Sequence, residues 1–205
     1  QALTPLAVYL SAGGHLRNDA GRPSLQPDIL TAALQVFRNG AVRGAFTSTV
    51  TTLSTLGQSW QGFAHSEAKW SLAWSSDYLL NMPENTRISR LPSAGARSVT
   101  LMNGWAFAVT EDNAAWREQC LKLALYLTEP EFLAEWSKAA GAIPSRPDAL
   151  ALWADSEVKS SLISIMETAE IMPSADLLQT VSSPLKSALL DVLSNKAESE
   201  LAAAT

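Results

Sequence analysis

Turn-forming residues recur along this chain at intervals too short for any very long helix or strand. Gly13-Gly14, Asn18–Pro23, Asn39-Gly40, Pro92–Gly95 and Asn103-Gly104 each interrupt or follow an apolar stretch. Such clusters mark turns because glycine and asparagine accept positive φ angles and proline fixes φ. The stretches between them show either helical periodicity or short alternation of period two. This order predicts an α/β or α+β chain, mostly helical with a small mixed sheet.

Two neighbouring helices give the clearest local signals. Asn113–Leu127 has an apolar stripe at helical spacing. Thr128 followed by Glu131 reads as a capping box, which predicts a helix that begins there and runs to Ala140. A last, alanine-rich helix is predicted over Lys196–Ala203. Short strands are predicted over Lys69–Ala73, Arg87–Leu91, Ser98–Met102 and Trp105–Val109.

Composition excludes several classes of protein. The net charge of −5 comes with no basic cluster, so a nucleic-acid-binding surface is not expected. No apolar run approaches the roughly 18 residues of a membrane span. The single cysteine, Cys120, excludes an internal disulfide and is expected to be a buried thiol. His15 and His65 lie far apart without further ligands at a recognised spacing, so no metal site is predicted.

Catalytic signatures are missing from the sequence. It contains no Gly-x-Ser-x-Gly elbow, no glycine-rich phosphate loop and no Cys/His pairing in a suitable context. Most of the twenty acidic residues fall on predicted helix faces or caps, where a solvated charge is the simpler interpretation. We therefore expect no enzymatic activity and no cofactor.

Four ordered segments resemble the C-terminal portion of the family 1 extracellular solute-binding proteins of ABC importers, the maltose-binding-protein-like family. The most specific segment contains a glycine–aromatic strand, two helices and a Gly-x-x-Pro-x-Arg loop, in that order. Ser66-Glu67 replaces the family's usual Gly-Lys, and the following loop reads Trp-Ser-Ser-Asp rather than Gly-x-Trp. The segments are Tyr9–Gly14 with Asn18–Gly21 and Phe37–Gly40, then Trp60–Trp74, then Met102–Val109 with Leu127–Phe132 and Gly141–Arg146, and finally Ala169–Pro173.

The resemblance implies an α/β, periplasmic-binding-protein-like (type II) lobe, with the N-terminal lobe largely absent from the 205 residues. It implies that residues 1–100 form the ligand-binding core of the second lobe. Residues 101–155 would complete the first lobe, and residues 156–205 would supply helices that pack on the second. A missing N-terminal lobe or a dimer partner would then cover the exposed inter-lobe face.

The function implied by the resemblance is binding of an extracellular solute and its delivery to ABC permease subunits. Closure of two lobes around the solute would carry out this step. The implied location is extracytoplasmic, in the periplasm or as a cell-surface lipoprotein, with any export signal upstream of Gln1.

The predicted solute is a carbohydrate. Sugar sites combine flat aromatic faces with carboxylates, amides and arginines that pair with hydroxyl groups. Trp74, Asp77 and Tyr78 lie in a predicted strand-to-helix loop, and Asn103-Gly104-Trp105 offers an amide, close backbone approach and an aromatic ring. The candidate ligand-binding residues are Trp74, Asp77, Tyr78, Asn103, Gly104, Trp105, Arg146 and, placed by the resemblance, Ser182.

Each candidate has a structural alternative. Asp77 could cap the helix that follows it, Arg146 could be a surface charge, and the tryptophans could pack in a core. Trp116, Trp136 and Trp153 lie in helical patterns, where packing is the expected role. At the level of function, the alternatives are a non-catalytic interaction module without a small ligand, a binder of a non-sugar solute such as a polyamine, iron or a phosphate compound, and a polysaccharide-active enzyme.

Overall fold

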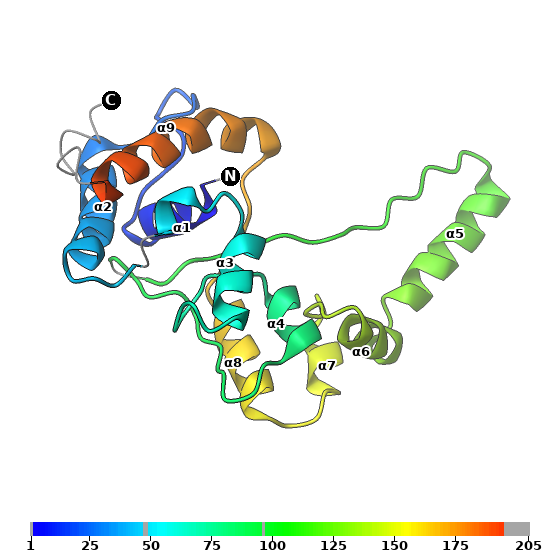
Figure 1. Ribbon diagram of the computed structural model, residues 1–205. Coiled ribbons are helices and arrows are strands. Elements are labelled where there is room, and N and C mark those ends of the chain that lie inside the picture. The colour runs from blue at the N-terminus through cyan, green and yellow to red at the C-terminus, as the bar shows by residue number, and fades with distance from the viewer. Residues whose placement is uncertain (1, 47–48, 96, 195–205) are drawn as a thin grey trace. The chain divides into compact units, whose positions relative to one another are not determined.

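A computed structural model describes residues 2–46, 49–95 and 97–194 (Figure 1). The predicted helix over Lys196–Ala203 lies outside these residues. The elements in chain order are α1 (Leu3–Ser11), α2 (Pro27–Val42), the 3-10 helix η1 (Val50–Thr52), α3 (Leu56–Ala64), α4 (Ser75–Asn81), β1 (Thr100–Met102), α5 (Ala114–Leu127), α6 (Pro130–Ala139), α7 (Pro147–Ala151), α8 (Glu157–Met166), β2 (Ala169–Ile171) and α9 (Ala175–Leu193).

The chain divides into two compact units. The first contains the described parts of Gln1–Leu72, Arg90–Met102 and Ile165–Thr205, and the second contains Ala73–Ser89 and Asn103–Ser164. Both units are discontinuous in sequence, so segments far apart in the chain meet within each of them. The predicted architecture of many helices with one small sheet is confirmed.

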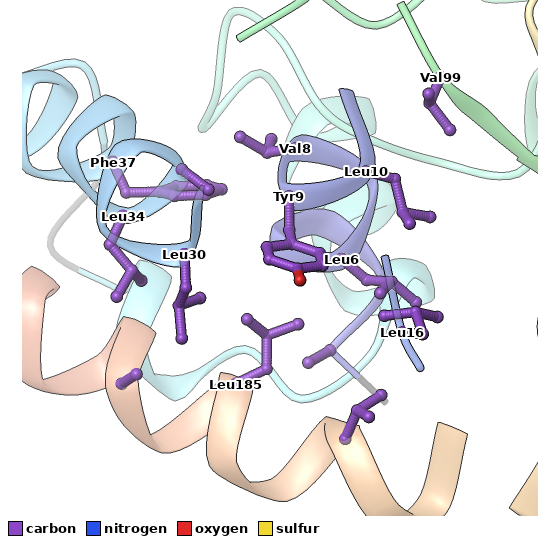
Figure 2. Close-up of a cluster of buried hydrophobic side chains, with 14 of the residues drawn as sticks. Leu6, Val8, Tyr9, Leu10, Leu16, Leu30, Leu34, Phe37, Val99 and Leu185 are labelled. Atoms are coloured by element: carbon purple, nitrogen blue, oxygen red, sulfur yellow. The ribbon is translucent and has the colours of Figure 1, made fainter. Parts of the chain in front are cut away.

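Unit 1 is built around α1, which is buried along almost its whole length. Leu6 and Tyr9 are 1% and 0% exposed, and they pack with Leu34 of α2 and Leu185 of α9 (Figure 2). A helix that is apolar all round must be covered on every side, and α2, α9 and β1 contact it. This packing is the main source of stability in the unit.

The small sheet of unit 1 pairs segments almost seventy residues apart. β1 and β2 run parallel, with Thr100 opposite Ala169 and Met102 opposite Ile171. Backbone hydrogen bonds extend the pairing at both ends, from Thr100 N to Thr168 O at 2.8 Å and from Met172 N to Met102 O at 2.8 Å. The strand predicted over Ser98–Met102 is therefore confirmed for Thr100–Met102.

The three other predicted strands are wrong, because these segments are not strands in the described chain. No backbone–backbone hydrogen bond pairs Lys69–Ala73, Arg87–Leu91 or Trp105–Val109 with another described segment, so alternation alone did not make them strands.

Unit 2 has a smaller core where α6 and α7 meet. Leu133, Ala134 and Ala149 form it, with Trp153 packed against them. The Trp153 indole donates to the carbonyl of Ala134 at 3.1 Å, which confirms the expected packing role of this tryptophan.

The predicted capping box at Thr128 is wrong, although the helix after it is confirmed. Glu129 is the N-cap of α6, whereas Thr128 closes α5. The Thr128 hydroxyl donates to Ala124 O and Leu125 O at 3.1 and 2.9 Å. Because α5 runs to Leu127, the carbonyl groups of its last turn lack intrahelical partners. The Thr128 hydroxyl donates to two of them and therefore does not cap the N-terminus of α6.

Cys120 also departs from its prediction. The thiol is exposed, because α5 buries none of its residues among the described parts of the chain.

Candidate functional site

Seven of the eight candidate residues belong to unit 2, and Ser182 lies half-buried on α9 in unit 1. Within unit 2 the candidates occupy three local motifs, at the start of α4, in the extended segment before α5, and at the start of α7.

The first motif is the N-terminus of α4. Trp74 has extended backbone, with φ −71° and ψ 147°, and is half-buried. Its backbone N–H donates to the Asp77 carboxylate at 3.2 Å. Asp77 thus makes the capping contact given above as the alternative to ligand binding, and a carboxylate in this first turn also suits the helix dipole.

Tyr78 follows on the same helix and points inward. It is 7% exposed, and its hydroxyl donates to the carbonyl of Thr86 at 3.4 Å. The Thr86 hydroxyl in turn donates to Pro83 O at 2.5 Å. The tyrosine therefore connects α4 to the loop that follows it.

The second motif precedes α5. The Asn103 side-chain oxygen accepts the backbone N–H of Gly104 at 2.8 Å. No atom lies within 4 Å of the position a Gly104 Cβ would occupy. The Trp105 side chain is 99% exposed, so its indole face is available to a ligand or to another polypeptide surface.

Arg146 makes the third motif, at the N-cap of α7. Its Nε and Nη2 donate to the two carboxylate oxygens of Asp148 at 3.0 and 2.6 Å, and Nη1 donates to Thr128 O at 3.1 Å. The side-chain hydrogen bonds from Arg146 hold the pKa of the Asp148 carboxyl below its ordinary value. This fork-to-carboxylate geometry orients the guanidinium and ties the end of α5 to α7.

One close approach joins two of these motifs. Gly141 begins the Gly-x-x-Pro-x-Arg loop that ends at Arg146, and it lies against Leu80 of α4. The helix that carries Trp74 and Asp77 is thereby held beside the loop that carries Arg146. No hydrogen bond among the described residues joins one candidate motif to another, although Arg146 also donates to Thr128 O at the end of α5.

Sequence reasoning missed two grooves. A polar groove of about 420 Å³ in unit 1 is lined by Arg90, Arg97, Glu167 and Glu170, with Arg97 paired to Glu170. These residues meet only through the parallel pairing of β1 with β2, for which spacing along the chain gave no signal. A second groove, of about 480 Å³ in unit 2, lies between residues 107–112 and α5.

Two further searches covered the described residues. They contain no group of three or more His, Cys, Asp or Glu side chains arranged to hold a metal ion. None of the helices in residues 2–46, 49–95 and 97–194 is long and apolar enough to cross a membrane.

Comparison with known proteins gives a family and a fold. A sequence profile for the family described as bacterial extracellular solute-binding protein matches residues 3–162. Among solved structures, maltose-bound MalE3 of T. maritima is similar with a TM-score of 0.68 and 20% identity. The similarity covers 98% of this chain and 54% of that chain, so this chain spans about half its length. Comparison with curated proteins gives no match.

Proposed function

Because this chain belongs to the bacterial extracellular solute-binding proteins, we propose that it binds a carbohydrate outside the cytoplasm and delivers it to the permease of an ABC importer. The match to the family over residues 3–162 is the observation that carries the proposal. It covers all the candidate residues except Ser182.

Carbohydrate as the solute is supported by the chemistry available in unit 2. Trp105 offers a free indole face and Trp74 a half-buried one, and rings of this kind stack on the C–H face of a pyranose. Asn103, Asp77 and Arg146 supply an amide, a carboxylate and a guanidinium for hydroxyl groups. The maltose in the similar T. maritima structure supports the same class of solute.

The proposed role is binding rather than catalysis, and an interaction-only module fits less well. That alternative predicts Trp74 and Trp105 buried in separate places, whereas Trp105 is 99% exposed.

We also propose the lobe assignment that the resemblance implies. Residues 1–100 and 156–205 would belong to a second lobe, and residues 101–155 would complete a first lobe supplied outside these residues. The boundary between units at Met102 and Asn103 supports the first division, whereas residues 73–89 fall in unit 2 and depart from it. Closure of the lobes around a solute would produce the form that the permease subunits recognise.

The experiment is a titration of the 205-residue protein with a panel of mono- and oligosaccharides that includes maltose. Binding is measured by isothermal titration calorimetry and by the change in melting temperature. Saturable binding should raise the melting temperature by mass action. Trp74→Ala and Trp105→Ala should abolish it, whereas Trp136→Ala, which removes a half-exposed tryptophan of α6, should not. Binding of a polyamine instead, or unchanged sugar binding in both site variants, would refute the proposed solute or site.

A further inference from the structure

Arg146 is held on two sides by groups of its own unit. Its Nε and Nη2 donate to the two carboxylate oxygens of Asp148 at 3.0 and 2.6 Å, and Nη1 donates to Thr128 O at 3.1 Å. Thr128 closes α5 and Asp148 lies in the first turn of α7, so two separate elements fix the plane of the guanidinium. The arginine is therefore oriented before any solute binds, which lowers the entropic cost of binding.

These contacts leave a defined set of donors for a solute. A guanidinium has five N–H groups and no acceptor. Three of them are committed to Asp148 and Thr128, so one N–H on Nη1 and one on Nη2 make no hydrogen bond within the described part of the chain. The side chain of Arg146 is 45% exposed, and a solute can approach it. Two such donors suit the hydroxyl oxygens of a sugar.

The charge around Arg146 is not positive in excess. Asp148 lies against the guanidinium, and Glu131 in the first turn of α6 also acts on it through its charge. Hydrogen bonding to Asp148 raises the pKa of Arg146, and the charges of Asp148 and Glu131 add to this rise. The same hydrogen bonding lowers the pKa of the Asp148 carboxyl, so both groups are charged at neutral pH. One cation thus lies beside two anions.

An anionic solute gains little from an arginine in this state. A phosphate or carboxylate group binds arginine most strongly through a charged, bidentate pair. The Nε and Nη2 edge of Arg146 already makes this pair with Asp148. A second anion would also meet repulsion from Asp148 and Glu131, whereas an uncharged hydroxyl group would not.

We propose that Asp148 is a specificity-determining residue of the solute site, which positions Arg146 and makes the site prefer uncharged sugars over sugar phosphates and sugar acids. Asp148 can act in this way only if Arg146 contacts the solute, so this role rests on the proposed function. It also disfavours the phosphate compounds that the sequence left open as solutes.

The test compares uncharged sugars with their anionic analogues on the 205-residue protein. The pairs are glucose with glucuronate, galactose with galacturonate and maltose with maltose 1-phosphate, titrated by isothermal titration calorimetry. They carry the charge at different positions, so the result does not depend on one orientation of the sugar. The wild-type protein should bind the uncharged member of a pair about tenfold more tightly or better, because the anionic member meets two carboxylates.

Asp148→Asn removes the charge while keeping the size of the side chain and one acceptor oxygen. The ratio of the two dissociation constants should shift by about tenfold or more towards the anionic member in at least one pair, because Arg146 then presents an unpaired positive charge. An aspartate with a purely structural role would instead weaken both members alike and leave the ratio unchanged.

Two further variants serve as controls. The double variant Arg146→Ala with Asp148→Asn should lose the gain for the anionic member, because no guanidinium remains to bind it. Asp155→Asn removes a carboxylate of unit 2 that pairs with Lys159 instead, and it should leave the ratio unchanged. Circular dichroism of each variant should match that of the wild-type protein.

The outcomes separate the role of Asp148 from the proposed function. Absence of saturable binding for every sugar, charged or not, would refute the proposed function and the role of Asp148 with it. Three other results would overturn the role of Asp148 alone. These are preference of the wild-type protein for an anionic member, an unchanged ratio in Asp148→Asn for every pair, and an equal gain for the anion in the double variant.

Discussion

Gly141 lies so close to Leu80 that a Cβ on this glycine would stand 2.5 Å from the Cγ of the leucine. The backbone of Gly141 is also left-handed, with φ +64°. Two independent requirements, space and backbone angle, thus select glycine here. The contact holds α4 beside the loop that leads to Arg146.

Gly141→Ala should therefore destabilise unit 2. The left-handed backbone alone costs about 1–2 kcal/mol for a residue with a Cβ, and crowding against Leu80 adds about 1–3 kcal/mol. Hydrogen exchange of the α4 amides would measure the loss of stability locally. A single melting curve would instead average the unfolding of the two units. Adding Leu80→Ala should relieve only the crowding part.

Gly104→Ala is the matched control for this glycine. Its Cβ would meet no atom within 4 Å and its φ is not positive, so we expect little change in exchange. Equal effects at both glycines would contradict the packing argument.

Asp77 allows its cap role to be separated from a ligand role. Asp77→Ala removes the acceptor for the Trp74 N–H and should cost about 1 kcal/mol of α4 stability. Asp77→Glu keeps a carboxylate at the third helical position, where glutamate serves the same bond. Normal hydrogen exchange but weaker maltose binding in Asp77→Glu would identify a ligand contact, and unchanged binding in both variants would leave only the cap.

Local chemistry predicted much of the helical structure. Pro27 at the first position of α2 and Gly141 after α6 both act through neighbouring backbone groups, whereas Asn39-Gly40 does not end α2, which runs to Val42. Such signals need no knowledge of the rest of the fold. The helical periodicity of the sequence likewise predicted the helix over Ala114–Leu127.

Pairing between residues far apart in the chain could not be predicted from local sequence in the same way. β2 joins β1 across almost seventy residues, and nothing in the spacing of Thr100 and Ala169 indicates the register. Arg146 was expected to face a solute, but its pairing with Asp148 and Thr128 depends on how α5 and α7 meet. Exposure of Trp105 and Cys120 likewise depends on packing that no local pattern encodes.

Lys159 should stabilise unit 2 by donating hydrogen bonds to backbone carbonyl groups, a role that the sequence alone does not indicate. Its ammonium donates to Ala151 O at 2.9 Å, Trp153 O at 2.7 Å and Asp155 at 3.0 Å, and its side chain is only 12% exposed. Lys159→Met leaves the carbonyls at the end of α7 without this donor, which should cost about 1–3 kcal/mol. Chemical denaturation monitored by Trp153 proton signals in NMR would report it.

Lys186→Met provides the comparison, because this exposed lysine of α9 should change stability by less than about 0.5 kcal/mol. A Lys159 variant as stable as the Lys186 variant would show that the observed hydrogen bonds are energetically neutral.

The buried phenol of Tyr9 should make unit 1 sensitive to alkali. Burial raises the pKa of Tyr9, and its hydroxyl both donates to His15 O at 2.8 Å and accepts from Gln26 N at 2.9 Å. The unfolded chain loses this proton near the ordinary pKa of about 10, while the folded chain still holds it. Stability should thus be independent of this group below about pH 9 and fall as pH rises through 10 towards the folded pKa.

Tyr9→Phe should cost about 1 kcal/mol at neutral pH, because two part-buried backbone groups, His15 O and Gln26 N, lose their partner. It should also flatten the alkaline loss of stability, since no phenol remains to titrate at that position. Denaturant midpoints of unit 1, followed between pH 7 and 11 by hydrogen exchange in α1, would test both effects. An alkaline loss of the same size in Tyr9→Phe would place its origin in another group.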